Sequence, residues 1–177
     1  MKALLIIDMQ NGCLLPYTRR HDTPGVIGRI NSLSEKFRLK KYPVIFIQHD
    51  GTAENELFPQ TNDWALVADL VNHPSDILIS KTAQDSFYQT SLQQTLSGFG
   101  ITEIYITGSA ADFCVDTTIK SALSKDYKIT VISDCHTTED KANLPAKTLI
   151  AYYNWIWSAL APTKYKVSVI KAAEFEE

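Results

Sequence analysis

The sequence predicts an α/β protein with three layers, α/β/α, around a six-stranded and mostly parallel sheet. Two observations lead to this prediction. Short, continuous apolar runs, typical of strands buried on both faces of a sheet, recur along the chain. Segments with apolar residues at helical spacing lie between most of these runs, and strands that alternate with helices form parallel sheets through right-handed crossovers.

The predicted strands occupy residues 3–7, 43–48, 76–80, 103–107, 127–133 and 166–170. The predicted helices occupy residues 23–40, 85–96, 112–124 and 144–160. Thr23 and Pro24 supply an N-cap and a first-turn proline for the first helix, and Gly98 ends the second. Residues 51–75 are irregular, and a loop of this length is often a lid or pocket wall. The alternation is that of a Rossmann-like sheet.

Composition limits the class of protein. With 177 residues and 45% hydrophobic content, we expect one domain, residues 1–177, with a full core. A net charge of −3 without a dense basic cluster argues against nucleic acid or a membrane surface as partner. No apolar run approaches the roughly 20 residues of a membrane span, and the first run is too short for a signal peptide. Three widely spaced cysteines give neither a disulfide framework nor a zinc spacing, so we expect a cytoplasmic protein.

Cys114 is the residue around which a function is expected. It follows the strand 103–107 and lies where the helix 112–124 begins. Backbone N–H groups at a helix start are unpaired and carry partial positive charge, so they stabilise a thiolate and lower its pKa. A thiol with a lowered pKa is a nucleophile at neutral pH. The alternative is a buried structural cysteine, which is common for free cysteines.

Asp8 and Lys81 come at the carboxyl ends of two other predicted strands, where ligands bind in open α/β sheets. A turn-forming aspartate and a solvated surface lysine are the alternatives. In a doubly wound sheet the first strand commonly lies beside the fourth, which would bring both residues to Cys114. There Asp8 can act as general base, Lys81 can lower the thiol pKa and hold the carboxylate, and Cys114 can attack a carbonyl. The N–H of Cys114 and one from the turn 108–111 could form an oxyanion hole.

Two further pairs of residues are candidates for metal binding or catalysis. His49 and Asp50 are adjacent at a strand end, where neighbouring side chains point in opposite directions, and no second histidine lies at ligand spacing. We therefore expect a polar loop lining the cleft rather than a metal site. Cys135 and His136 have no third partner in the sequence and are interpreted as structural.

The predicted last helix carries more apolar circumference than one sheet can cover. Leu149, Tyr152, Tyr153, Ile156 and Leu160 share one face, and two tryptophans, 155 and 157, flank it. Such a surface indicates a subunit interface, so we expect a homo-oligomer, either a dimer or a tetramer.

The chain resembles the isochorismatase-like cysteine hydrolases, which include nicotinamidases, carbamoylsarcosine-type amidohydrolases and ureidoacrylate hydrolases. Residues 5–11 (Leu-Ile-Ile-Asp-Met-Gln-Asn) are similar to the first-strand motif of that family. Ser80-Lys81 is similar to its lysine segment, and residues 108–115 (Gly-Ser-Ala-Ala-Asp-Phe-Cys-Val) to its nucleophile segment. Residues 44–51 are similar to a second-strand variant of one uncharacterised branch, and residues 134–138 to the strand end that follows the nucleophile segment.

The resemblance implies roles for individual residues. Asp8, Lys81 and Cys114 would form a catalytic triad, and the amides of Ala110 and Cys114 the oxyanion hole. It also implies a non-proline cis peptide, which would fall between Ser109 and Ala110.

Departures from the family pattern bear on the substrate. Nicotinamidases carry Asp-x-His and further histidines as a metal site, but this chain has His49-Asp50-Gly51 and no matching histidines, so we expect no metal and no cofactor. Isochorismatases proper lack the cysteine, so Cys114 favours acyl chemistry. Gly12 and Cys13 stand where relatives usually have an acidic residue and Phe, so an aromatic pocket wall is absent. Cys13 could open room beside the nucleophile or could pair with it on oxidation. The residues expected to bind substrate are Gln10, Cys13, His49, Trp64, Phe87 and Phe113, although each aromatic one also suits core packing.

The expected function is a metal-independent thiol hydrolase that acts on a small-molecule substrate. It would cleave a C–N bond of an amide, carbamoyl or ureido compound through a thioacyl-enzyme. Two alternatives stay open. One is isochorismatase-type hydrolysis with Asp8 as general acid and Cys114 as a bystander. The other is a noncatalytic ligand-binding or assembly protein that retains the fold.

Overall fold

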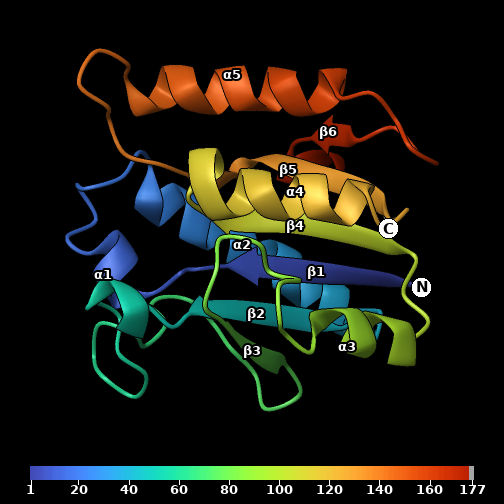
Figure 1. Ribbon diagram of the computed structural model, residues 1–177, viewed down its shortest axis with the longest axis horizontal. Helices are drawn as coiled ribbons and strands as arrows, with labels where there is room; N and C mark the ends of the chain where they lie inside the picture. The colour runs from blue at the N-terminus through green and yellow to red at the C-terminus, as the bar shows by residue number, and fades with distance from the viewer. Residues whose placement is uncertain (176–177) are drawn as a thin grey trace.

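The computed structural model describes residues 1–175 and has a six-stranded, all-parallel sheet at its centre (Figure 1). The strand order is β3-β2-β1-β4-β5-β6. The strands are β1 (Lys2–Ile7), β2 (Val44–His49), β3 (Ile77–Lys81), β4 (Glu103–Ser109), β5 (Lys128–Thr137) and β6 (Ser168–Ile170). The predicted α/β class and all six strands are confirmed. β5 extends to Thr137, four residues beyond the predicted strand 127–133.

The helices are α1 (Asn11–Leu14), α2 (Thr23–Leu39), α3 (Leu92–Gly98), α4 (Asp116–Leu123) and α5 (Ala146–Ala159). A π-helical turn, Ala111–Val115, precedes α4 directly, and 3-10 turns occupy Thr52–Glu54 and Ala172–Glu174. The N-cap of α2 is Asp22 rather than Thr23, because Thr23 is already helical and its hydroxyl donates to the Arg20 carbonyl.

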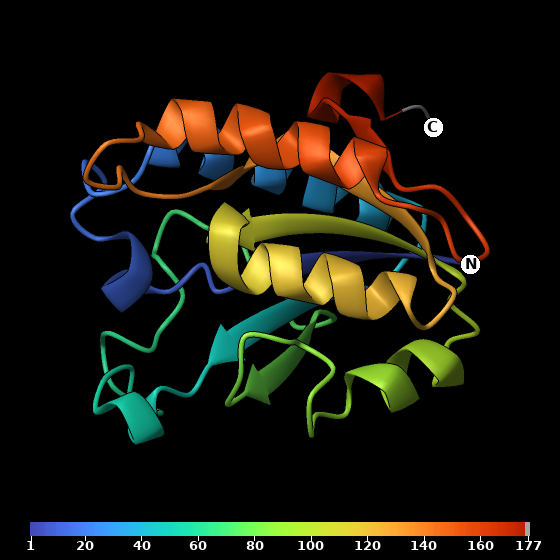
Figure 2. The same cartoon turned by 45° about the horizontal axis from the view of Figure 1, so that its top comes forward.

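Helices cover both faces of the sheet. On one face α2 buries its apolar stripe, including Val26, Ile30 and Phe37, against β1 and β2. On the other face α3, α4 and α5 pack on the sheet through residues such as Leu96 and Ile119. Figure 1 shows α3 and α4 in front of the sheet and α2 behind it, and Figure 2 shows α5 beside α4. Burying each large apolar side chain contributes about 1.5–3 kcal/mol, so the two layers hold the sheet rigidly.

The second predicted helix starts later than expected, at Leu92 instead of Asp85. The Asp85 carboxylate accepts the N–H of Phe87 at 2.8 Å, which is a local turn that competes with a helix. Gln89 has φ 52°, outside the right-handed helical region. Residues 85–91 therefore form turns that lead from β3 to α3.

The strand order creates a crevice at the centre of the sheet. β1 pairs with β2 on one side and with β4 on the other, and the connections after β1 and β4 run over opposite faces. This is a topological switch point, where ligands bind in open α/β sheets. Gly108 lies at the switch with φ 120°, and a Cβ there would overlap the backbone of Ile7. Glycine is therefore required for β4 to lie this close to β1.

The outer surface of α5 differs from the predicted one. Trp157 is fully buried and its indole N–H donates to Asp116 at 3.0 Å. Tyr152 and Trp155 are 52% and 62% exposed, and their rings stack with centroids 5.8 Å apart. Only these two aromatic residues of the helix stay largely open to solvent. Over the residues that the structure describes, none of the helices combines the length and apolarity needed to cross a membrane.

Candidate active site

Asp8 is the first residue after β1 and is almost fully buried, with 3% exposure. Its N–H continues the sheet by donating to the Ile47 carbonyl at 2.9 Å, and its φ of 49° turns the chain out of the strand. Aspartate tolerates this left-handed conformation better than most residues. The turn leaves the carboxylate at the carboxyl end of the sheet, where one of its oxygens, Oδ1, has no hydrogen-bond partner among the described residues.

Lys81 is the last residue of β3 and lies opposite His49 of β2 in the sheet register. Its side chain is 0% exposed. The ammonium contacts Asp8 Oδ2 at 2.8 Å, Cys114 Sγ at 3.3 Å and the Ala83 carbonyl at 3.0 Å, so each of its three protons has an acceptor. Burial acts to lower the pKa of Lys81, but Asp8 and Cys114 outweigh it and the net shift is upward. The amine therefore stays charged.

Cys114 lies in the π-helical turn that follows the cis peptide between Ser109 and Ala110. Its thiol is partly buried. Burial is the largest influence on the pKa of Cys114 and raises it, and the Asp8 carboxylate raises it further. Lys81 acts in the opposite direction but does not compensate. The expectation of a lowered thiol pKa is therefore wrong for the resting protein, because desolvation and a neighbouring carboxylate outweigh the ammonium and the helix start.

The consequence is a neutral thiol held beside a charged pair. A neutral thiol attacks a carbonyl only if a base takes its proton as the bond forms. The Asp8 carboxylate is close enough to influence the thiol pKa and has a free oxygen. The structure thus brings together the three residues that the sequence analysis singled out, one from each of three strand ends.

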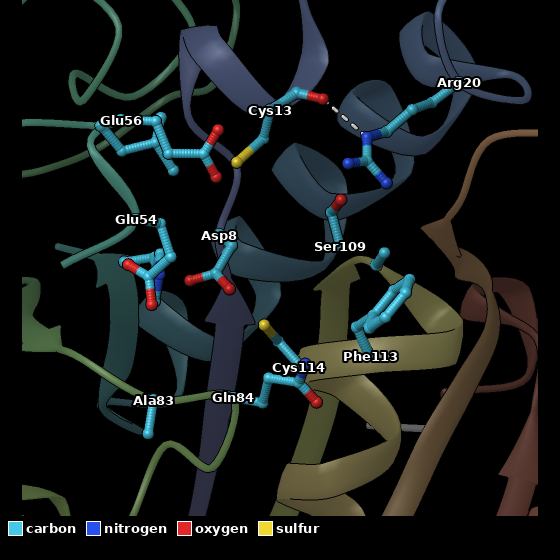
Figure 3. Close-up of a pocket in the computed structure, with 13 residues that line it drawn as sticks. Asp8, Cys13, Arg20, Glu54, Glu56, Ala83, Gln84, Ser109, Phe113 and Cys114 are labelled. Atoms are coloured by element: carbon cyan, nitrogen blue, oxygen red, sulfur yellow. Dashed lines mark hydrogen bonds and ion pairs between the residues drawn. The ribbon is translucent and has the colours of Figure 1, made fainter. Parts of the chain in front are cut away.

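A cavity of about 290 Å³ opens over these side chains (Figure 3). Asp8, Ala110 and Cys114 line it, and so do three of the predicted substrate-binding residues, Cys13, His49 and Phe113. The remaining wall residues are Arg20, Glu54, Glu56, Leu57, Ala83, Gln84 and Ser109. Lys81 does not line the cavity itself, but its ammonium contacts two residues that do, Asp8 and Cys114.

Cys13 and Phe113 lie on the wall in different environments. Burial raises the pKa of Cys13 to about 12, with Asp8 adding to the effect, so this thiol is also neutral. Phe113 is 45% exposed, and the Lys141 ammonium lies 5.0 Å from the centre of its ring. The Ala110 N–H, one of the two expected oxyanion-hole donors, donates no hydrogen bond to any residue the structure describes.

Three predicted substrate-binding residues do not line the cavity, and the expectation is corrected for them. Gln10 is 0% exposed and its amide is used internally: it accepts the His49 N–H at 2.7 Å and donates to the carbonyls of His49 and Trp64. Trp64 is not a wall residue, and it takes part through its backbone carbonyl, whose hydrogen bond from Gln10 holds the loop that contains Trp64. Phe87 is buried in the core, where it stacks on Tyr127 with ring centroids 5.9 Å apart.

His49 and Asp50 behave as a polar loop. His49 Nε2 lies 3.6 Å from the Glu54 carboxylate, and Asp50 accepts hydrogen bonds from the N–H and hydroxyl of Thr52, which lower the Asp50 pKa. Within residues 1–175 no group of three or more His, Cys, Asp or Glu side chains is arranged to hold a metal ion.

His136 lies away from the cavity and is almost fully buried. Its Nε2 lies 2.9 Å from Asn154 Oδ1, and burial lowers its pKa to about 4. Neighbouring Cys135 is buried in the core beneath α2. Both residues are packed as the sequence analysis interpreted them.

Four polar wall residues were not predicted from the sequence: Arg20, Glu54, Glu56 and Gln84. None of them follows a strand directly, and each lies in a polar stretch that reads as surface loop. The one available signal was that residues 51–75 were expected to form a pocket wall, and Glu54 and Glu56 belong to that loop.

Comparison with known proteins places the chain in a family. A model of the isochorismatase domain matches residues 2–153. Streptothricin hydrolase from Streptomyces noursei is 27% identical over 140 residues, which cover 79% of this chain and 51% of that protein. The chain thus spans about half the length of this relative. The uncharacterised isochorismatase family protein YaaI of Bacillus subtilis is 31% identical over 143 residues, 76% of this chain and 79% of that protein.

Solved structures agree with this placement. A crystal structure of an isochorismatase family protein has a TM-score of 0.87 and 30% identity, covering 96% of this chain and 98% of that one. N-carbamoylsarcosine amidase from Thermoplasma acidophilum has a TM-score of 0.78 at 22% identity, with 99% of both chains covered, and shares the fold. Since the family model covers most of the sequence, this chain belongs to the isochorismatase family.

Proposed function

We propose that this protein hydrolyses a C–N bond of a small amide, carbamoyl or ureido compound, with Cys114 as nucleophile, Asp8 as general base and acid, and Lys81 as the group that holds them. The observation that carries the proposal is the buried Lys81 ammonium, 2.8 Å from Asp8 and 3.3 Å from Cys114 beside a cavity. A buried charge is costly unless it is paired, and here the pairing also brings a base to a thiol. The hydrolases among the relatives are consistent with this chemistry.

The first step is acylation. The thiol is neutral, so Asp8 takes its proton while Cys114 Sγ bonds to the substrate carbonyl carbon. The C=O electron pair moves to oxygen, and the free N–H of Ala110, with that of Cys114, can stabilise the oxyanion. When the C–N bond breaks, the protonated Asp8 gives its proton to the leaving nitrogen, which departs as ammonia or an amine.

The second step is deacylation. Water attacks the thioester carbon while Asp8 takes one of its protons. The C–S bond then breaks, Asp8 returns the proton to sulfur, and the acid leaves. Lys81 keeps its proton in both steps, because Asp8 and Cys114 raise its pKa, and it compensates the negative charge that moves between oxygen and sulfur.

One observation favours a second candidate, isochorismatase-type hydrolysis with Asp8 as general acid. The raised pKa of Cys114 makes the resting thiol a poor nucleophile. In this reaction Asp8 would protonate the substrate directly and Cys114 would only line the cavity.

An ammonia-release assay on a panel of small amides, carbamoyl compounds and ureides tests the first candidate and the role of Cys114 in it. We expect turnover by the wild type, and a loss of roughly 1,000-fold or more in Cys114→Ala, since the residue forms the covalent bond. Cys135→Ala is the matched control, because Cys135 is buried in the core away from the cavity. Turnover that persists in Cys114→Ala would support the acid mechanism instead.

We further propose that the protein forms a homo-oligomer through the outer face of α5, where Tyr152 and Trp155 are exposed. Analytical ultracentrifugation of the wild type and of Trp155→Lys tests this. A monomeric wild type would contradict it.

A further inference from the structure

Buried polar atoms without a hydrogen-bond partner gather at the cavity. Six such side-chain atoms occur among residues 1–175, and four belong to residues of the cavity wall. These four are Asp8 Oδ1, Arg20 Nη1, His49 Nδ1 and Ser109 Oγ. Buried polar groups in folded proteins nearly always have partners, so an exception of this kind needs an explanation. A ligand that supplies the missing partners is one explanation. Arg20 needs such a partner most, because its group is charged and, unlike the Asp8 carboxylate, forms no ion pair.

Arg20 lies in the connection between α1 and α2, and its guanidinium is fixed in orientation. Its Nε donates to the Cys13 carbonyl at 2.6 Å, as the dashed line in Figure 3 marks. Nη1 is buried and unpaired. Arg19, the preceding residue, forms an ion pair with Glu139 at 3.5 Å, whereas no carboxylate of residues 1–175 lies within ion-pair distance of Arg20. Since a guanidinium is never deprotonated in proteins, Arg20 places on the wall a positive charge that no carboxylate matches in an ion pair, although this charge acts from a longer distance on Glu139, whose pKa it helps to lower.

The other charged groups at the cavity make the side that carries Arg20 the favourable one for an anion. The Lys81 ammonium is already matched by Asp8. Glu54 and Glu56 are exposed residues, and Figure 3 shows them on the side of the cavity opposite Arg20, with Asp8 and Cys114 between. An anionic group would be repelled on the glutamate side and attracted on the Arg20 side. The planar fork of a guanidinium matches a carboxylate in both charge and shape.

We propose that Arg20 determines specificity by binding a carboxylate that the substrate carries. The substrate class is then a small amide, carbamoyl or ureido compound with a free carboxylate, whose scissile carbonyl lies over Cys114 while the carboxylate reaches Arg20. This inference rests on the proposed function, because it places the reacting carbonyl at Cys114.

A matched pair of thiol reagents tests the inference without a known substrate. 3-Maleimidopropionate and 3-maleimidopropionamide add to thiols by the same reaction and differ by one negative charge. Peptide mass spectrometry gives the rate of each at Cys114, and the ratio of acid to amide rates is the readout. Charge-assisted hydrogen bonds predict a fall of roughly 10- to 100-fold in this ratio for Arg20→Gln. Arg19→Gln removes a neighbouring charge off the cavity wall and should leave the ratio unchanged.

The outcomes separate the two proposals. A ratio that is the same in wild type and Arg20→Gln, with both reagents labelling Cys114, would overturn the carboxylate site and leave the proposed nucleophile standing. Failure of both reagents to label Cys114 in the wild type would contradict the nucleophile, and the inference with it. The rate of the neutral amide also reports whether the cavity of the variant is intact.

A second measurement decides the matter if Arg20→Gln does not fold. In the wild type, sodium acetate should lower the acid-to-amide ratio relative to sodium chloride of the same ionic strength, because acetate competes for Arg20. A ratio that does not respond to acetate would overturn the proposal. In the ammonia-release assay, monoamides of dicarboxylic acids should be preferred over the matching diamides, and Arg20→Gln should remove that preference.

Discussion

Replacing Lys81 by methionine removes the ammonium between Asp8 and Cys114 and keeps the length of the side chain. The Lys81 side chain is 0% exposed and that of Asp8 is 5% exposed, so the carboxylate would be left buried without an opposite charge. Breaking a buried ion pair in this way costs about 3–5 kcal/mol. At about 2–4 °C per kcal/mol for a chain of this size, the melting temperature should fall by roughly 6–20 °C. Ammonia release should also be lost.

The control is the double substitution Asp8→Asn with Lys81→Met. It removes both charges together, and asparagine, like aspartate, tolerates the left-handed conformation at φ 49°. The free energy of unfolding should therefore return to within about 1–2 kcal/mol of the wild type, since replacing a buried pair is often nearly neutral. Activity should stay absent, which separates the stabilising role of the pair from its catalytic role.

Urea unfolding of the wild type, the two single variants and the double variant completes the cycle. We expect that the two single losses in the free energy of unfolding do not add in the double variant. If Lys81→Met costs less than about 1 kcal/mol, and the two losses add in the double variant, the ammonium is not a buried partner of Asp8. The reasoning about this site would then be refuted.

Three further predictions concern stability. Burial lowers the pKa of His136 to about 4, so between about pH 6.5 and pH 4 the unfolded chain binds a proton that the folded chain does not. The free energy of unfolding should therefore be unaffected by this residue above about pH 6.5 and fall by roughly 3 kcal/mol on the way to pH 4. Urea unfolding should show a smaller fall in His136→Gln. Gly108→Ala places a Cβ in the backbone of Ile7 at φ 120° and should cost more than about 2 kcal/mol or prevent folding, as thermal unfolding and soluble yield will show. Gln10→Met leaves the backbone N–H and C=O of His49 without their hydrogen-bond partners and should lower the free energy of unfolding by about 2–4 kcal/mol. At about 2–4 °C per kcal/mol, a melting temperature within about 2 °C of the wild type would contradict this.

The sheet and its central residues could be predicted from the sequence because their signals are local. The run from Ala3 to Ile7 is apolar throughout because both faces of β1 are covered. Such a continuous apolar run is typical of a strand in a buried parallel sheet. Asp8 follows such a run directly, Lys81 ends one, and Cys114 lies in the first turn of the helical segment after another, so all three must lie at the carboxyl edge of the sheet. The strand order that joins β1 to β4 brings them into contact.

The cavity wall could not be predicted in the same way, because it depends on where loop side chains point. Gln10 follows Asp8 by only two positions, yet its amide turns inward to hold His49 and Trp64. Arg20 comes from a polar stretch with no periodicity. The thiol pKa also depends on opposing influences of burial and two charges, and their balance is visible only once the distances are known.

Mass spectrometry of the protein quenched in acid during turnover of an amide substrate tests whether Cys114 is the nucleophile. We expect an acyl group attached to the peptide that contains Cys114, absent when the substrate is omitted and absent in Cys114→Ala. Turnover without any acylated Cys114 peptide, and with undiminished rate in Cys114→Ala, would contradict it.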